Sequence, residues 1–267
     1  MELSVIVNIF VPVITGLLYF GMALEVERVS KIRKIMFGEI GYQKLFIAFI
    51  LFGIYFITRP LQNIMGPHPW PMIINSARQF FIMAVIAPSV FVSILHWVPG
   101  EGGAPKSSEF AAYAIGICMG IIFVLTNSMA IDGSKIIGSM GQWLTLYDAK
   151  WFSQGTRQIQ LVLIHLIVQL ISPVGLIILA SAFVRHRRHN YMLGAVYTNM
   201  KTKWRYMETG LIIMALSIIS AGITALFGRY FTYLWVIYFA GSIVSGGFVL
   251  YSIKLAPRDN PSDLKNV

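Results

Sequence analysis

Four polar side chains share one face of a long apolar segment around position 165. They are spaced seven, four and three residues apart, and they are Gln158, His165, Gln169 and Ser172. This spacing places all four on one continuous face of an α-helix. Because histidine changes charge near neutral pH, the face predicts a ligand pocket or a polar pathway, without assigning a catalytic role. The alternative is that these side chains form hydrogen bonds between helices and stabilise their packing.

A second group of polar and aromatic residues lies between two apolar segments, in residues 59–78. Its guanidinium groups and aromatic rings predict a mouth that holds an anionic or amphipathic ligand. The members are Arg59, His68, Trp70, Asn75 and Arg78, and Asp132 lies in the segment expected opposite them. The alternative is a proline-stiffened loop in which the long Arg78 side chain extends to the membrane surface.

Other familiar chemistry is missing from the sequence. Phosphate-binding loops, zinc-protease motifs and a plausible Ser-His-Asp set are absent, so we predict no catalytic residue, no cofactor and no metal site. A retinal Schiff base needs a lysine in the middle of the last apolar segment, where Ser242 stands. His96 and His165 are expected in opposite halves of the bilayer, which argues against a bis-histidine haem. An enzyme is therefore the less favoured interpretation.

The elements that must position these residues are membrane-spanning helices. The chain of 267 residues is 57% hydrophobic and 12% charged, whereas soluble domains contain about 45–50% apolar and about 25% charged residues. A spanning helix needs about 20 mostly apolar residues. The sequence therefore predicts an all-α integral membrane protein, a seven-transmembrane helix bundle without a soluble domain. The expected spans are residues 3–24, 43–58, 71–97, 108–130, 157–183, 206–227 and 231–253.

Two segments are harder to place. The second span is expected to end at Arg59, because the residue before Pro60 avoids the helical region. In residues 131–156, aromatic side chains recur every four residues, at Trp143, Tyr147 and Trp151. This spacing is that of one face of a short helix, and aromatic residues favour the membrane interface. We expect a helix lying on the membrane surface, or alternatively an ordered lid.

Small residues four positions apart predict close contacts between helices. They stand at Ala112, Gly116 and Gly120 in the fourth span, at Ser217, Ala221 and Ala225 in the sixth, and at Gly241 and Ser245 in the seventh. These positions could pack against other helices of the same chain or against another membrane subunit or a second copy.

Basic residues predict the orientation of the bundle. With the N-terminus outside, the inner segments hold fifteen of the 21 Lys and Arg residues, and the outer segments hold six. Cytoplasmic segments of membrane proteins are enriched in these residues, so we predict an outside N-terminus and a cytoplasmic C-terminus. The expected cytoplasmic basic face comprises Arg28, Lys31, Arg33, Lys34, Arg185, Arg187, Arg188, Lys201, Lys203 and Arg205.

The basic face predicts contact with anionic lipid headgroups, at about 1 kcal/mol for each base near the surface. Docking of a cytoplasmic signalling partner is the alternative. The net charge of +10 does not indicate nucleic acid, because topology explains the clusters. The expected location is a plasma membrane or a bacterial inner membrane.

Three functions fit these observations. The first is a receptor-like sensor that binds a small or lipid-like ligand in the outer half of the bundle and signals through the basic face. The second is a non-catalytic subunit of a larger membrane complex. The third is a small transporter or channel, or an enzyme acting on lipids. It is least favoured, because Asp and Glu are absent from every span centre.

Overall fold

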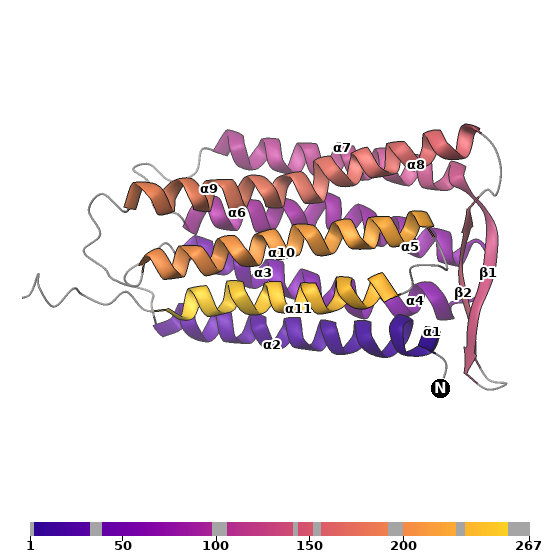
Figure 1. Ribbon diagram of the computed structural model, residues 1–267, viewed down its shortest axis with the longest axis horizontal. Helices are drawn as coiled ribbons and strands as arrows, with labels where there is room; N and C mark the ends of the chain where they lie inside the picture. The colour runs from indigo at the N-terminus through magenta and orange to yellow at the C-terminus, as the bar shows by residue number, and fades with distance from the viewer. Residues whose placement is uncertain are drawn as a thin grey trace, which may run out of the picture.

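The computed structural model is a bundle of helices capped at one end by a two-stranded β-hairpin (Figure 1). It describes residues 3–32, 39–97, 106–140, 144–151, 156–191, 200–227 and 233–255. The helices are α1 (Leu3–Val5), η1 (Ile6–Phe10), α2 (Val11–Ile32), α3 (Glu39–Ile57), α4 (Arg59–Ile64), α5 (Trp70–Phe81), η2 (Ile82–Ile86), α6 (Ala87–Trp97), α7 (Lys106–Ala130), α8 (Thr156–Gln169), η3 (Leu170–Gly175), α9 (Leu176–Tyr191), α10 (Met200–Phe227) and α11 (Tyr233–Lys254). The strands are β1 (Ile131–Met140) and β2 (Leu144–Trp151).

Seven helical stretches within the described ranges are long and apolar enough to cross a membrane. They are Ile6–Lys31, Gly41–Ile64, Trp70–His96, Lys106–Ala130, Gln160–His186, Lys201–Ile223 and Leu234–Lys254. Each contains or overlaps one of the seven expected spans. The prediction of a seven-helix membrane bundle is therefore confirmed, and the chain is a multi-pass membrane protein.

Six of the seven spans form a closed ring, and the fourth span, α7, packs outside it. Around the ring α2 contacts α3, α3 contacts α6, α6 contacts α9, α9 contacts α10, α10 contacts α11, and α11 returns to α2. The outlying helix α7 packs against α5, η2 and α8. Its other face carries exposed apolar side chains such as Phe110 and Leu125, as expected for contact with lipid tails.

The two ends of the bundle differ in character (Figure 1). At one end, called here the hairpin end, lie α4, the start of α5, the β-hairpin and the N-terminus. At the other, called here the basic end, lie the ends of α2, α6, α9 and α11 and the starts of α3, α7 and α10. The basic end carries most of the Lys and Arg residues, among them Lys31, Lys44, Arg185 and Lys254.

The prediction of a surface helix in residues 131–156 is wrong, because most of this segment forms the antiparallel hairpin β1–β2. Residues four apart share a face of a strand as well as of a helix, so the spacing of Tyr147 and Trp151 did not distinguish the two. The strand register shifts next to Gly133 and Gly138, as is common where glycine allows a bulge. The alternative of an ordered lid agrees with the hairpin's place across the helix ends (Figure 1). Trp143 lies outside the described residues.

The second span continues past the expected stop at Arg59. Helix α3 ends at Ile57, but Thr58 keeps a helical conformation and α4 runs on to Ile64. Pro60 lies in the first turn of α4, where a missing backbone N–H costs no helical hydrogen bond. This extra turn and a half brings the polar end of the span under the hairpin.

Small residues let the helices approach closely, as the spacing predicted. An added Cβ at Gly116 of α7 would overlap the carbonyl oxygen of Met83 in η2, and one at Gly241 would overlap the Ser217 hydroxyl. In the same α10–α11 contact, Ser245 Oγ donates to the carbonyl oxygen of Gly210 at 2.8 Å. These small residues therefore serve contacts within the chain.

Replacing Gly116 by alanine should destabilise the bundle, because the new methyl group meets rigid backbone. We expect a loss of about 1–3 kcal/mol, typical of overpacking, and a lower midpoint of thermal unfolding in detergent. The matched control is Gly21→Ala in α2, where an added Cβ meets no atom within 4 Å. Equal midpoints for the two variants would contradict the tight α7–η2 contact.

Candidate functional site

Two buried arginines meet at the hairpin end of the bundle. Arg59 comes from α4 and Arg78 from α5, and each is only 6% exposed. Both guanidinium groups donate to the same atom, the Gln62 side-chain oxygen Oε1. The Nη1 atom of Arg59 lies 3.2 Å from it, and the Nη1 atom of Arg78 lies 3.0 Å from it. Two positive charges therefore converge on one neutral acceptor.

The remaining contacts of Arg59 come from the first and last spans. Its Nη2 atom donates to the Asn8 side-chain oxygen at 3.3 Å. Its guanidinium carbon lies 4.4 Å from the ring centroid of Trp235 in α11, a cation–π distance. Its Nε atom is buried and makes no hydrogen bond. Arg59 therefore has fewer acceptors than its five N–H groups can use.

Arg78 is held by the carbonyl end of α3. Its Nε and Nη2 atoms both donate to the Tyr55 carbonyl oxygen, at 3.3 and 3.1 Å. Its guanidinium carbon lies 4.4 Å from the centroid of the Tyr55 ring. The negative end of a helix dipole and an aromatic face both favour a cation. This arrangement fixes the plane of the guanidinium group and leaves one of its edges facing Gln62.

The hairpin is docked onto the same site by side chains of α4. Gln62 Nε2 donates to Asp148 Oδ1 of β2 at 3.2 Å, and Asn63 Nδ2 donates to the Tyr147 carbonyl oxygen at 2.8 Å. The Asn63 side-chain oxygen is buried without a hydrogen bond. On β1, Ser134 Oγ accepts a hydrogen bond from the backbone N–H of His68 at 3.0 Å.

The charge balance of this site is unusual for a membrane protein. Within the described ranges, neither Arg59 nor Arg78 forms an ion pair, although buried charges are normally paired. Asp148 reaches them only through the Gln62 amide. Two like charges that share one acceptor atom repel each other. Intramembrane ionisable groups of this kind are candidate functional sites.

The structure brings together only part of the mouth expected from the sequence. Arg59 and Arg78 share an acceptor, whereas Trp70 is 46% exposed and His68 contacts the hairpin through its backbone. Sequence reasoning missed Gln62, because the span was expected to end before it. It also missed Asp148, in a segment whose structure was not determined by its spacing. The two polar residues Gln62 and Asn63, one turn beyond Arg59, were the sequence feature that could have indicated that the site continues past Arg59.

The polar face expected in the fifth span is not continuous. Ser172 has extended backbone angles (φ −145°, ψ 121°) inside η3, so the helical spacing breaks there. Its Oγ donates to the Met83 carbonyl oxygen of η2 at 3.1 Å. The Gln158 side chain lies outside the described part of the structure.

The other two residues of this face contact different helices. His165 is buried and stacks on Phe123 of α7, with ring centroids 4.3 Å apart. Gln169 packs against Gly222 of α10, where an added Cβ would lie 2.5 Å from the Gln169 side-chain oxygen. Contacts with three separate elements fit the packing interpretation of this face. Its role in ligand binding stays a prediction.

At the basic end, acidic residues pair with much of the expected basic face. Glu208 of α10 is buried and pairs with Arg185 at 2.6 Å and Arg188 at 2.7 Å, both on α9. Glu25 pairs in the same way with Arg28 at 2.7 Å and with Lys254 of α11 at 2.6 Å. The pairs of Glu208 and the Glu25–Lys254 pair connect neighbouring helix ends, whereas Glu25–Arg28 lies within α2. The sequence count of bases missed them because it did not consider nearby acids.

The other members of the expected basic face differ in their surroundings. Lys201 and Arg205 are exposed, and Lys31 pairs with Glu27 at 2.7 Å on the surface of α2. Lys203 is only 2% exposed and therefore does not contribute to the surface. Arg33, Lys34 and the side chain of Arg187 lie outside the described residues.

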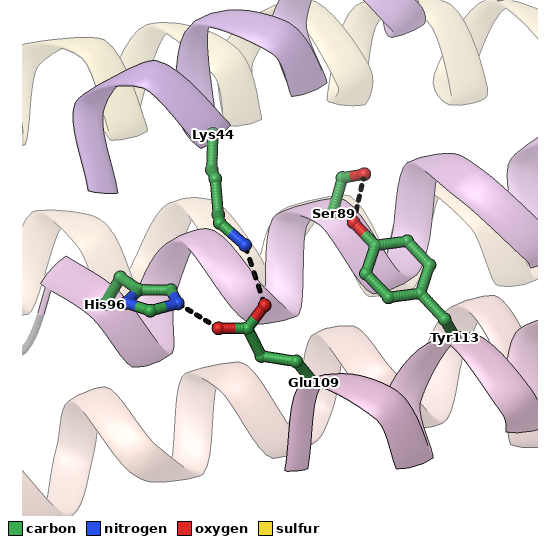
Figure 2. A network of polar contacts seen from close by, with 5 residues as sticks. All are labelled: Lys44, Ser89, His96, Glu109 and Tyr113. Carbon is green, nitrogen blue, oxygen red and sulfur yellow. Dashed lines mark hydrogen bonds and ion pairs between the residues drawn. The ribbon is translucent and has the colours of Figure 1, made fainter. Parts of the chain in front are cut away.

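A further polar network joins three spans at the basic end (Figure 2). Glu109 of α7 accepts from Lys44 of α3 at 2.8 Å and contacts the His96 ring nitrogen of α6 through its other oxygen (Figure 2). Nearby, the hydroxyl groups of Ser89 and Tyr113 lie 3.1 Å apart and connect α6 to α7. One carboxylate therefore bridges the ends of the second and third spans, the same spans that carry Arg59 and Arg78.

Within the described ranges, no group of three or more His, Cys, Asp or Glu side chains could hold a metal ion. No known protein family, no curated protein and no solved structure matches this chain. Function must therefore be inferred from the site itself.

Replacing Glu208 by glutamine should leave Arg185 and Arg188 without a carboxylate. Since Glu208 is buried and one partner is exposed, we expect a loss of about 1–3 kcal/mol, seen as a lower thermal unfolding midpoint in detergent. Glu27→Gln is the matched control, because its pair with Lys31 is exposed and contributes less than about 0.5 kcal/mol. A Glu208 variant as stable as this control would show that the α9–α10 pairs are not structurally important.

Proposed function

We propose that this protein is a receptor-like membrane sensor. It binds a small or lipid-like ligand at the hairpin end and signals through the basic end, which faces the cytoplasm. The observation that carries the proposal is the buried pair Arg59 and Arg78 beneath the hairpin, two cations that no carboxylate of the described residues contacts. Buried charges of this kind are costly for stability alone, which supports a role in binding.

The spans offer a direct path between the two ends. The α3–α4 span carries Lys44 at the basic end and Arg59 at the hairpin end. The α5–α6 span likewise carries His96 and Arg78. At the basic end both spans contact the single carboxylate of Glu109 (Figure 2). A small movement of one span against the other would therefore change this network, which is what a transmembrane signal requires.

Two other functions remain hypotheses. A non-catalytic subunit would use small residues to contact another chain, but Gly116 and Gly241 pack within this chain. A small transporter or channel lacks a specific observation in its favour. Contact of exposed Lys201 and Arg205 with anionic headgroups, and docking of a cytoplasmic partner, are compatible with the sensor.

The sensor hypothesis predicts that ligand binding at the hairpin end changes hydrogen–deuterium exchange at the basic end. Oleate, ubiquinone-1 and free amino acids serve as probes for hydrogen–deuterium exchange of the reconstituted protein. A bound probe should slow exchange in residues 59–64 and also change it in residues 94–97 and 106–110. The coupling should disappear in Glu109→Gln, which removes the shared carboxylate. A response limited to the hairpin end would show binding without signalling.

The proposed orientation has its own test. Alkaline phosphatase inserted between Met140 and Leu144 should be active, because the hairpin would lie outside. Green fluorescent protein fused to the C-terminus should fluoresce, because that end would be cytoplasmic. Exchanging the two reporters provides the control, and both exchanged fusions should be silent. The opposite result would reverse the assignment of ligand end and signalling end.

A further inference from the structure

We infer that Arg59 and Arg78 bind a carboxylate, one of whose oxygens takes the position of Gln62 Oε1. This inference rests on the proposed function, since it names the ligand class of the same site. The ligand is a carboxylic acid with an apolar or aromatic body, bound as its anion beneath the hairpin.

The first argument is the shared acceptor. The Nη1 atoms of Arg59 and Arg78 approach one carbonyl oxygen, Gln62 Oε1, at 3.2 and 3.0 Å. A carboxylate oxygen, like the Gln62 amide oxygen, is bonded to a planar carbon and accepts hydrogen bonds in the same directions, but it carries negative charge. Hydrogen bonds from guanidinium to carboxylate are shorter and stronger than those to a neutral amide. The protein therefore already holds the donors in the arrangement that a carboxylate needs.

The second argument is the set of donors left over. The Arg59 side chain is more than nine-tenths buried, and its Nε atom has no hydrogen-bond partner. Aromatic rings cover the faces of both guanidinium groups, Trp235 for Arg59 and Tyr55 for Arg78. Covered faces leave only the edges, and an edge of guanidinium matches a planar carboxylate in two parallel hydrogen bonds. The Trp235 ring is only partly buried and therefore also provides apolar surface for the body of the ligand, whereas the Tyr55 ring is buried.

The third argument concerns the hairpin. The Gln62 amide separates its carboxylate, Asp148, from the two arginines. Asp148 Oδ1 accepts from Gln62 Nε2 at 3.2 Å and from the Ala149 backbone N–H at 2.9 Å. It makes no ion pair with either arginine within the described residues. Gln62 therefore stands between an anion on the hairpin and two cations in the bundle. A carboxylate that replaces the Gln62 oxygen would also disturb the bond that docks the hairpin.

The test supplies the missing carboxylate from the protein itself. In the double variant Gln62→Glu, Asp148→Asn, the new glutamate meets both arginines, and the new asparagine can donate to it. We expect this variant, purified in detergent with chloride as the only small anion, to unfold several degrees above wild type. The matched control Gln160→Glu makes the same substitution at an exposed position of α8 and should unfold like wild type.

The second arm uses benzoate as the probe, with sodium chloride at equal ionic strength as reference. Benzoate should raise the unfolding midpoint of wild type and of Gln160→Glu, but not that of the double variant, whose site is filled. Equal stabilisation of all three proteins, or of none, would overturn the inference. Stabilisation of wild type by inorganic phosphate but not by benzoate would also overturn it, because the ligand would then not be a carboxylate.

The outcomes separate the two proposals. Benzoate binding without any change of exchange at residues 94–97 and 106–110 would support the carboxylate site and contradict the sensor. An exchange response to ubiquinone-1 in a protein that ignores benzoate would support the sensor and contradict the carboxylate site.

Discussion

The hydrogen bonds of Arg59 and Arg78 to one amide oxygen connect much of the hairpin end of this protein. Through Gln62 both cations are connected to the hairpin, and Arg59 also contacts the first and last spans through Asn8 and Trp235. Like charges repel, so this arrangement persists only because rings, helix carbonyl groups and amides surround it. The same surroundings fix the guanidinium groups in one orientation, which is the condition that the proposed binding of an anion requires.

Close packing provides the framework that holds this polar site. Gly116 lets α7 touch the backbone of η2, and Ser172 donates to the Met83 carbonyl oxygen at the same place. The contacts lie in the middle of the third and fifth spans, where π-helical turns alter the regular hydrogen-bond pattern. The third span is therefore closely packed at its middle by both neighbouring spans.

Ion pairs give the basic end a different character. Glu109 and Glu208 each hold two cationic or potentially cationic side chains from neighbouring helices, and Glu25 holds Arg28 of its own helix and Lys254 of α11. Partly exposed pairs of this kind contribute modestly to stability but set the register of helix ends. At the hairpin end, by contrast, two buried cations have no acidic partner among the residues that the structure describes.

The sequence by itself determined the seven spans, because membrane insertion depends on the composition of about 20 consecutive residues. It also predicted that Arg59 and Arg78 lie near each other, because only a short stretch of chain joins the second and third spans. The tertiary structure alone decided the rest of the site. Arg59 meets Asn8 across 51 residues, and Gln62 meets Asp148 across 86. Such contacts depend on how the helices pack against each other. They also depend on the hairpin, whose aromatic residues have a four-residue spacing that fits a helix as well as a strand. Local periodicity carries no information about them.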